Sequence, residues 1–202
     1  LNALMGIQNA LTNRQKNLEG LAEQLAWEYL PKINSNPKGI EKFLFFESKV
    51  VNYSVNTLKN KKQNFNLFDL SYSEGAFITK EDLKGTFLLF NSPIALPVFV
   101  LDKEDFKTTL YQWAGFDDIN FKKHPDFSKR FHLSGNDQRE IKALFGSELI
   151  YFFESHPIFH IESNGKRLLI KGNDRLSGLQ EIKIMLSFAQ DLVKLLEKSE
   201  RN

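Results

Sequence analysis

The sequence predicts an α+β domain: an antiparallel meander sheet and an Asn-Gly hairpin, packed by a long C-terminal helix, with an N-terminal helix and a central helical pair. Three observations lead to this fold class. Polar and apolar residues alternate through much of the first half of the chain, as in half-exposed strands. Asn164-Gly165 is the preferred dipeptide of a two-residue hairpin turn. Apolar residues from Leu179 to Leu196 recur with the three-four spacing of a helix.

The chain is expected to open with a helix. Residues 11–30 carry apolar side chains at helical spacing, and Pro31 ends this run. Residues 34–39 then form a turn-rich connector, after which the apolar period changes to two. We therefore expect residues 1–33 to be an N-terminal helix that follows a removed anchor, and residues 40–202 to be a single α+β domain.

Five short strands are expected in the next part of the chain. They cover residues 43–48, 50–58, 65–72, 86–91 and 98–101. Pro93 and Pro97 separate the last two strands, because proline cannot donate a hydrogen bond within a central strand. Their short connections favour a meander.

Helices are expected again in the middle of the chain. Asp102 is a suitable N-cap for a helix that ends at Gly115. Ser134 is expected to cap another helix with Asp137 at its third position, and Ser147 to restart a shorter one.

The hairpin turn at Asn164-Gly165 predicts which residues of its two strands face one another. A two-residue turn places Glu162 opposite Arg167, as an exposed ion pair, and puts His160 on the same face as Glu162. The other face is apolar and carries Phe159, Ile161, Leu168 and Ile170.

The closing helix has its own start signal and a wide apolar face. Ser177 is expected to cap it while Gln180 reaches back, as in a capping box. A second apolar stripe lies beside the first, and such a wide face is typical of a helix that packs on a sheet. A coiled coil is the less favoured alternative, because apolar residues occupy its flanking positions too.

Composition excludes several classes of protein. The 202 residues contain no cysteine, which excludes a disulfide framework, cysteine-bound zinc and a thiol nucleophile. The 27 basic and 25 acidic residues nearly balance, so no nucleic-acid partner is expected. No apolar run approaches the roughly 20 residues that span a bilayer. We expect the chain as given to be soluble, and the protein to be cytoplasmic or membrane-associated.

Acidic residues and histidines supply a few weak ligand candidates. Asp117 and Asp118 are adjacent carboxylates, which can bind a cation or act as acid and base. A solvated loop is the favoured interpretation, since no third ligand follows at regular spacing. His160 and Glu162 share a strand face, and His132 has no evident partner. Convergence of these groups in a pocket would indicate an enzyme.

Lys59, Lys61 and Lys62 form the one concentrated positive spot. Phosphate or an anionic lipid is the functional interpretation of such a cluster, whereas a solubilising loop tip is the more common one. The sequence has no phosphate-binding loop, nucleophile elbow, zinc-binding helix motif or dinucleotide fingerprint. We expect no catalytic residue, no metal ligand and no cofactor.

Several stretches of the chain resemble a broad group of uncharacterised bacterial proteins. One series runs from Asp126–Asp137 (DFSKRFHLSGND) through Ile141–Phe145 (IKALF) to Ile161–Leu169 (IESNGKRLL), and the other stretch is Leu96–Leu101 (LPVFVL). In that group a hydrophobic segment near the N-terminus often precedes a soluble α+β region. The resemblance implies a bacterial origin and a membrane anchor upstream of Leu1, and it supplies no catalytic residue.

These patterns favour a non-catalytic binding or scaffolding domain with an unknown protein or lipid partner, in the soluble part of a membrane-anchored protein. One alternative is a lipid or small-molecule binding module whose cup is lined by some of the 19 phenylalanines. A second alternative is a metal-assisted hydrolase that uses Asp117 and Asp118.

Overall fold

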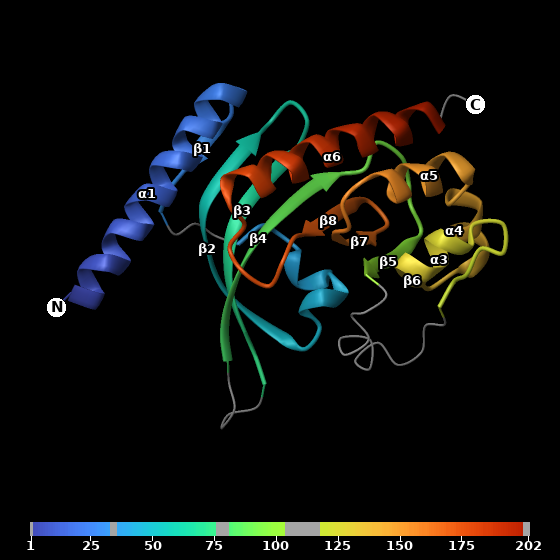
Figure 1. Cartoon of the computed structure of the whole chain (residues 1–202), viewed down its shortest axis with the longest axis horizontal. Coiled ribbons are helices and arrows are strands. Elements are labelled where there is room, and N and C mark those ends of the chain that lie inside the picture. The colour runs from blue at the N-terminus through green and yellow to red at the C-terminus, as the bar shows by residue number, and fades with distance from the viewer. Residues whose placement is uncertain (1, 33–35, 76–80, 104–117, 200–202) are drawn as a thin grey trace.

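The structure is a computed structural model that describes residues 2–32, 36–75, 81–103 and 118–199, with side chains from Asn13 to Lys198 (Figure 1). The helices are α1 (Asn2–Leu25), α3 (Pro125–Arg130), α4 (Gln138–Leu144), α5 (Ser147–Ser155) and α6 (Leu179–Ser199), with 3-10 turns η1 (Ile40–Lys42) and η2 (Leu44–Phe46). The strands are β1 (Glu28–Leu30), β2 (Lys49–Asn60), β3 (Phe65–Glu74), β4 (Glu81–Asn91), β5 (Val98–Lys103), β6 (Phe131–Gly135), β7 (His160–Asn164) and β8 (Arg167–Lys171).

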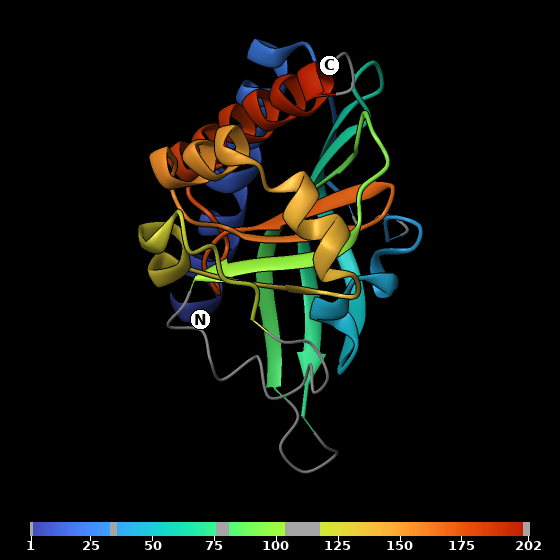
Figure 2. The ribbon, with the colours of Figure 1, turned by 90° about the vertical axis from the view of Figure 1, so that its right-hand side faces the viewer.

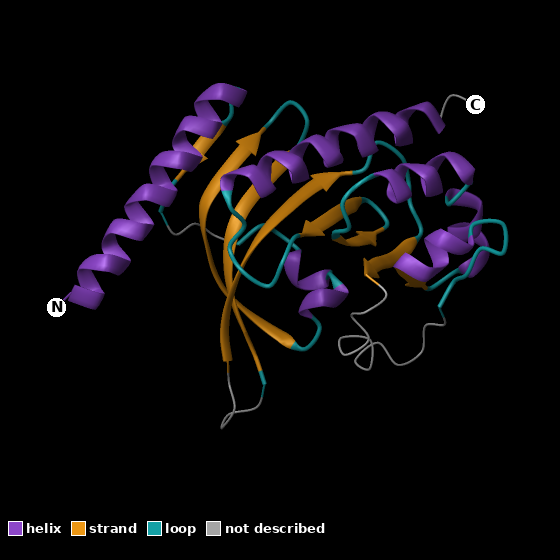
Figure 3. Ribbon diagram, viewed as in Figure 1, coloured by secondary structure: helices purple, strands orange, loops and turns teal. Residues whose placement is uncertain are grey.

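The predicted α+β fold class is confirmed. The described strands form one antiparallel sheet in the order β1-β2-β3-β4-β8-β7-β5-β6. Figure 3 shows these strands together with the helices that surround them. The β7–β8 hairpin therefore lies between β4 and β5 and interrupts the simple meander expected from the sequence. Within the described ranges, no helix combines the length and the apolar character that crossing a membrane requires.

The sheet separates two apolar cores. The long helices cover one face, and η1 and η2 cover the other (Figure 2). On the helical face, α6 buries Ile182, Met185 and Leu192 against the strands. α1 contributes Leu18 and Leu21 to the same core, so the first helix packs on the sheet.

The second core contains the segment predicted as the first strand, and that prediction is wrong. Residues 43–48 include η2, the second of the two 3-10 turns, and Phe43, Phe45 and Phe46 are all buried there. A strand would send the adjacent Phe45 and Phe46 to opposite faces. The turns bring both rings onto one core, where they meet Tyr72.

The faces of the hairpin are as predicted, but its register is not. Ser163 pairs with Leu168 and Glu162 with Leu169, so the loop is two residues longer than expected. The side-chain oxygen of Asn164 accepts the N–H of Arg167 at 3.0 Å and thereby stabilises the wider turn. A shift of two residues preserves the two faces. The predicted exposed pair of Glu162 and Arg167 is therefore wrong, because Glu162 is buried.

Two predicted helix starts are shifted. Ser134 lies in β6 rather than at a cap, and Asp137 caps α4 by accepting the N–H groups of Arg139 and Glu140. Ser177 is buried before α6, and Glu181, not Gln180, accepts the Gly178 N–H at 2.7 Å. Ser134 is therefore part of the sheet, and Ser177 is buried in the interior.

Two other predicted helices also differ from the expected ones in their boundaries. The N-terminal helix ends at Leu25 rather than before Pro31, because residues 28–30 pair with β2 as an edge strand. The helix predicted from Asp102 to Gly115 lies outside the described residues beyond Lys103, and Asp102 itself belongs to β5.

Gly135, the last residue of β6, lies closely against β5. A Cβ atom there would lie 2.3 Å from the carbonyl oxygen of Val98 and 2.5 Å from Cδ1 of Ile141. We expect Gly135→Ala to lower the free energy of unfolding in urea by about 2 kcal/mol. Gly20→Ala is the control: no neighbouring atom outside its own helix backbone lies within 4 Å of such a Cβ. Alanine there should stabilise α1 by up to about 1 kcal/mol. Equal effects would contradict the close approach.

Candidate functional site

The predicted ligand residues are only partly brought together. Asp117 lies outside the described residues. Asp118 Oδ1 lies 3.3 Å from His132 Nδ1 and also accepts the Leu133 N–H. His132 in turn is the register partner of Asp102 on β5, whose carboxylate contacts His160. The two histidines therefore lie on either side of one aspartate.

His160 is held between two carboxylates on the second face of the sheet. Its Nδ1 lies 2.8 Å from Asp102 Oδ2, and its Nε2 lies 2.8 Å from Glu162 Oε1. The same Glu162 oxygen accepts the backbone N–H of Phe45 at 2.7 Å. Each ring nitrogen of His160 thus lies within hydrogen-bonding distance of a carboxylate oxygen, an arrangement that favours the doubly protonated imidazolium.

The surroundings of His160 shift its pKa in opposite directions. Burial lowers the pKa, since it penalises the charged form. The hydrogen bonds to Asp102 and Glu162, together with the negative charges of these groups, outweigh burial and raise the pKa of His160 to about 9. The imidazolium therefore persists through the neutral range.

This arrangement is poorly suited to acid-base chemistry. Both ring nitrogens of His160 are engaged with carboxylates in the contacts described, so neither is placed to take a proton from a substrate. Over the described residues, no three histidine, aspartate or glutamate side chains are placed to hold a metal ion. The His160 group serves instead to fix η2, because Glu162 binds the backbone of Phe45.

Two of the three candidate lysines lie beside Glu28, and the third lines a cavity. Lys61 Nζ forms an exposed ion pair with Glu28 at 3.0 Å. Lys59 lies opposite Glu28 in the register of β1 and β2, while Lys62 lines a cavity near the end of α6. Their role as an anion site stays a prediction.

A groove beside α1 was not predicted. It has a volume of about 600 Å³ and lies between α1, the outer strands and the segment that leads into α6. We call it the α1 groove and define it by its lining residues: Arg14, Gln15, Pro31, Lys32, Tyr53, Val55, Asn56, Asp69, Leu70, Ser71, Lys84 and Leu176. Its floor is a row of three strands, in which Ser71 of β3 pairs with Tyr53 on one side and Lys84 on the other. A volume of this size is typical of pockets for small organic ligands.

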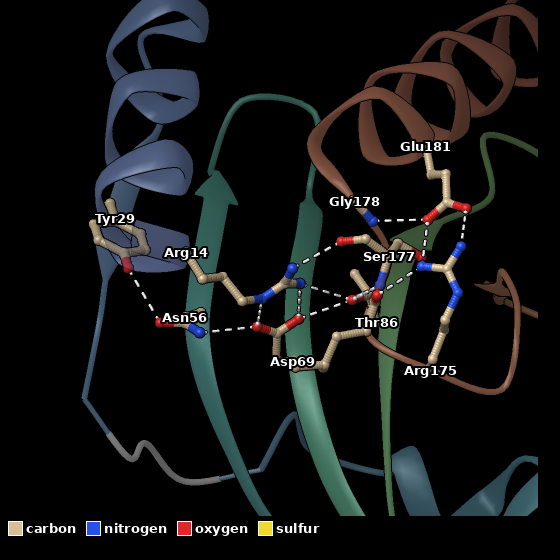
Figure 4. A network of polar contacts seen from close by, with 10 residues as sticks. Arg14, Tyr29, Asn56, Asp69, Thr86, Arg175, Ser177, Gly178 and Glu181 are labelled. Atoms are coloured by element: carbon tan, nitrogen blue, oxygen red, sulfur yellow. Dashed lines mark hydrogen bonds and ion pairs between the residues drawn. The ribbon is translucent and has the colours of Figure 1, made fainter. Parts of the chain in front are cut away.

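An ion pair between the partly buried Arg14 and the buried Asp69 forms part of the wall of the α1 groove. Nε and Nη2 of Arg14 donate to the two carboxylate oxygens of Asp69 at 2.7 and 2.6 Å (Figure 4). Asn56 and Thr86 donate to the same carboxylate, at 2.8 Å each. A third nitrogen of Arg14 donates to the carbonyl oxygen of Ser177 at 2.8 Å. The network thus joins α1, three strands and the start of α6.

Asp69 has no capacity left for chemistry. Four hydrogen bonds occupy its two oxygens, which matches the number that an ionised carboxylate accepts. Asn56 is held in turn by the Tyr29 hydroxyl at 3.1 Å. Burial, followed by the charges of Glu19 and Asp69, raises the pKa of Tyr29 to about 12, so this hydroxyl keeps its proton. The network is a clamp between elements.

The sequence does contain signals for Arg14 and Asp69, which were not among the predicted site residues. Arg14 precedes Leu18, Leu21 and Leu25 at three-four spacing, so it lies on the apolar face of its helix. A charged residue on such a face predicts a buried partner, because an unpaired buried charge is costly. Asp69 lies between Phe68 and Leu70 in a strand and is the one charged residue of the predicted strand 65–72, so it fits that role. Nothing in the sequence states that these two residues meet.

Comparisons with known proteins place the fold but not the family. No family model matches the chain, and no curated protein matches it. Among solved structures, the fold is similar to the crystal structure of the mycobacterial trehalose monomycolate transport factor A, TtfA. The TM-score is 0.65 over 90% of this chain and 93% of that chain, at 9% identity. An uncharacterised family, as the sequence resemblance implies, is consistent with these results.

Proposed function

We propose that the protein is a non-catalytic binding module that holds an amphiphile, a lipid-like molecule with an apolar chain and an anionic head, in the α1 groove. The groove carries this proposal. Its walls include the apolar groups of Pro31, Val55 and Leu176, against which a hydrocarbon chain gains burial. Lys84 lines the same groove, where its ammonium group can meet an anionic head.

The state of the charged groups supports a role in binding rather than in catalysis. Asp69 and His160 are buried, and the hydrogen bonds described above engage them with other protein groups. General acid-base catalysis needs a side chain that can exchange a proton with the substrate. Among the described residues that line the α1 groove, Asp69 is the one carboxylate, and four hydrogen bonds within the protein already occupy its oxygens.

The structural neighbour offers limited support. Its title names it a trehalose monomycolate transport factor, and transport is a role that binding without chemistry can serve. At 9% identity the likeness shows the fold alone. The proposal for this chain therefore depends on the α1 groove and is tested there.

Filling the α1 groove should weaken binding of an amphiphile. We expect the wild-type chain to increase the fluorescence of cis-parinaric acid in a saturable titration. Val55→Trp should weaken this binding by about tenfold or more, because the larger side chain occupies the space of the acyl chain. The dissociation constant from the titration is the measurement.

Val50→Trp is the matched control, since Val50 lies on the same strand, is 62% exposed and does not line the groove. It should bind the probe as the wild type does. Absence of saturable binding by the wild type would contradict the proposal and favour the protein-binding scaffold. Equal loss in both variants would locate binding elsewhere.

A further inference from the structure

A second cavity, of about 530 Å³, lies on the other face of the sheet and contains two buried lysines. We call it the Phe45 cavity, after the ring that both lysines approach. Lys49 Nζ lies 4.6 Å and Lys171 Nζ 5.2 Å from the centre of the Phe45 ring. The lysine side chains are only 5% and 4% exposed. Two ammonium groups therefore border the same Phe45 ring and the same cavity, whose volume suits a small ligand.

The carboxylates that pair with these lysines are more exposed to solvent than Glu162, which pairs with His160. Lys49 pairs with Glu74, which is 40% exposed, and Lys171 pairs with Asp174, which is 61% exposed. Glu162, the partner of His160, is 2% exposed. Glu74 and Asp174 reach water, so each can turn into solvent when another anion takes its place beside the buried lysine. An entering anion can therefore take the places of Glu74 and Asp174.

We propose that the Phe45 cavity binds a small organic phosphate monoester, with the phosphate between Lys49 and Lys171. A phosphate monoester carries a charge of about −1.5 to −2 at neutral pH, which two ammonium groups match. Lysine binds phosphate as a point charge and needs no fixed planar geometry. The remaining charges of the wall offset one another: Glu81 faces the cavity together with Lys103, and Asp102 is bound to His160.

The rest of the wall suits the organic part of such a ligand. Tyr72, Leu83 and Phe159 line the Phe45 cavity and present aromatic and apolar surface. This cavity shares no lining residue with the α1 groove and lies against the opposite core of the sheet. The proposal therefore stands apart from the proposed amphiphile site.

The test uses phenyl phosphate and calorimetric titration of the full chain at constant ionic strength. The wild type should bind phenyl phosphate more tightly than inorganic phosphate, because the ring adds apolar contact. Lys171→Met should weaken binding by about tenfold, since it removes one of two charges. Asp174→Asn should strengthen binding by about threefold, because the carboxylate that competes for Lys171 is gone.

Asp191→Asn provides a matched control. Asp191 and Lys194 form an ion pair of the same three-residue spacing on α6, outside the cavity. This substitution should leave the affinity unchanged. Because Asp174 is the carboxylate partner of the buried Lys171, circular dichroism first checks that Asp174→Asn keeps the fold. The proposal is overturned if phenyl phosphate binds no better than inorganic phosphate, or if Asp174→Asn fails to raise the affinity.

Discussion

Arg14→Met is expected to lower the free energy of unfolding by about 4 kcal/mol, the largest effect of any single substitution considered. Asp69 is buried, and Arg14 supplies its only described charged partner. Removal of the guanidinium leaves a carboxylate in the core with two neutral donors. The same change removes the hydrogen bond between Arg14 of α1 and the carbonyl oxygen of Ser177, just before α6. Urea denaturation followed by circular dichroism measures the loss.

The cost should come from the unpaired charge rather than from the lost arginine. The double variant Arg14→Met with Asp69→Leu removes both charges, and we expect it to recover much of the loss. Arg175→Met is the surface control: Arg175 is 61% exposed and pairs with Glu181 in the same region (Figure 4). It should cost at most about 1 kcal/mol. Similar losses for Arg14→Met and Arg175→Met would contradict the role of the buried pair.

The protein should lose stability as the pH rises from neutrality toward 9.5. The pKa of His160 is about 9 in the folded protein and 6.5 in the unfolded chain. A raised pKa stabilises the fold fully below the unfolded value, and this stabilisation disappears as the pH passes the folded value. The loss between about pH 6.5 and 9.5 should be about 3 kcal/mol. Urea midpoints at a series of pH values measure it.

His160→Gln should remove this pH dependence, because glutamine does not titrate. The variant should be less stable than the wild type near pH 6, and the gap should narrow as the pH rises. His124→Gln is the control: the described polar contact of His124 is the hydroxyl of Ser147, with no carboxylate. It should keep the wild-type pH profile. A pH dependence that survives in His160→Gln would show that another group causes it.

The sequence predicted how residues divide between faces better than it predicted which strands pair. The hairpin faces were correct, because alternation along a strand is a local property. The hairpin register was wrong, because Asn164 stabilises a wider turn. The strand order was wrong too, because β4 pairs with β8. The candidate residues show the same limit: His160 and Glu162 were placed together correctly, while their contact with Asp102 was not foreseen.

The sequence by itself determined the fold class, the faces of the hairpin and the long closing helix, because each follows from spacing along a few turns or strands. Only the tertiary structure decided the position of the hairpin within the sheet, the clamp at Asp69 and the two cavities. Arg14 and Asp69 are 55 positions apart, and no local pattern encodes their meeting. Pairing over such distances depends on how the whole sheet and both cores pack, so the proposed binding sites emerge only in the folded chain.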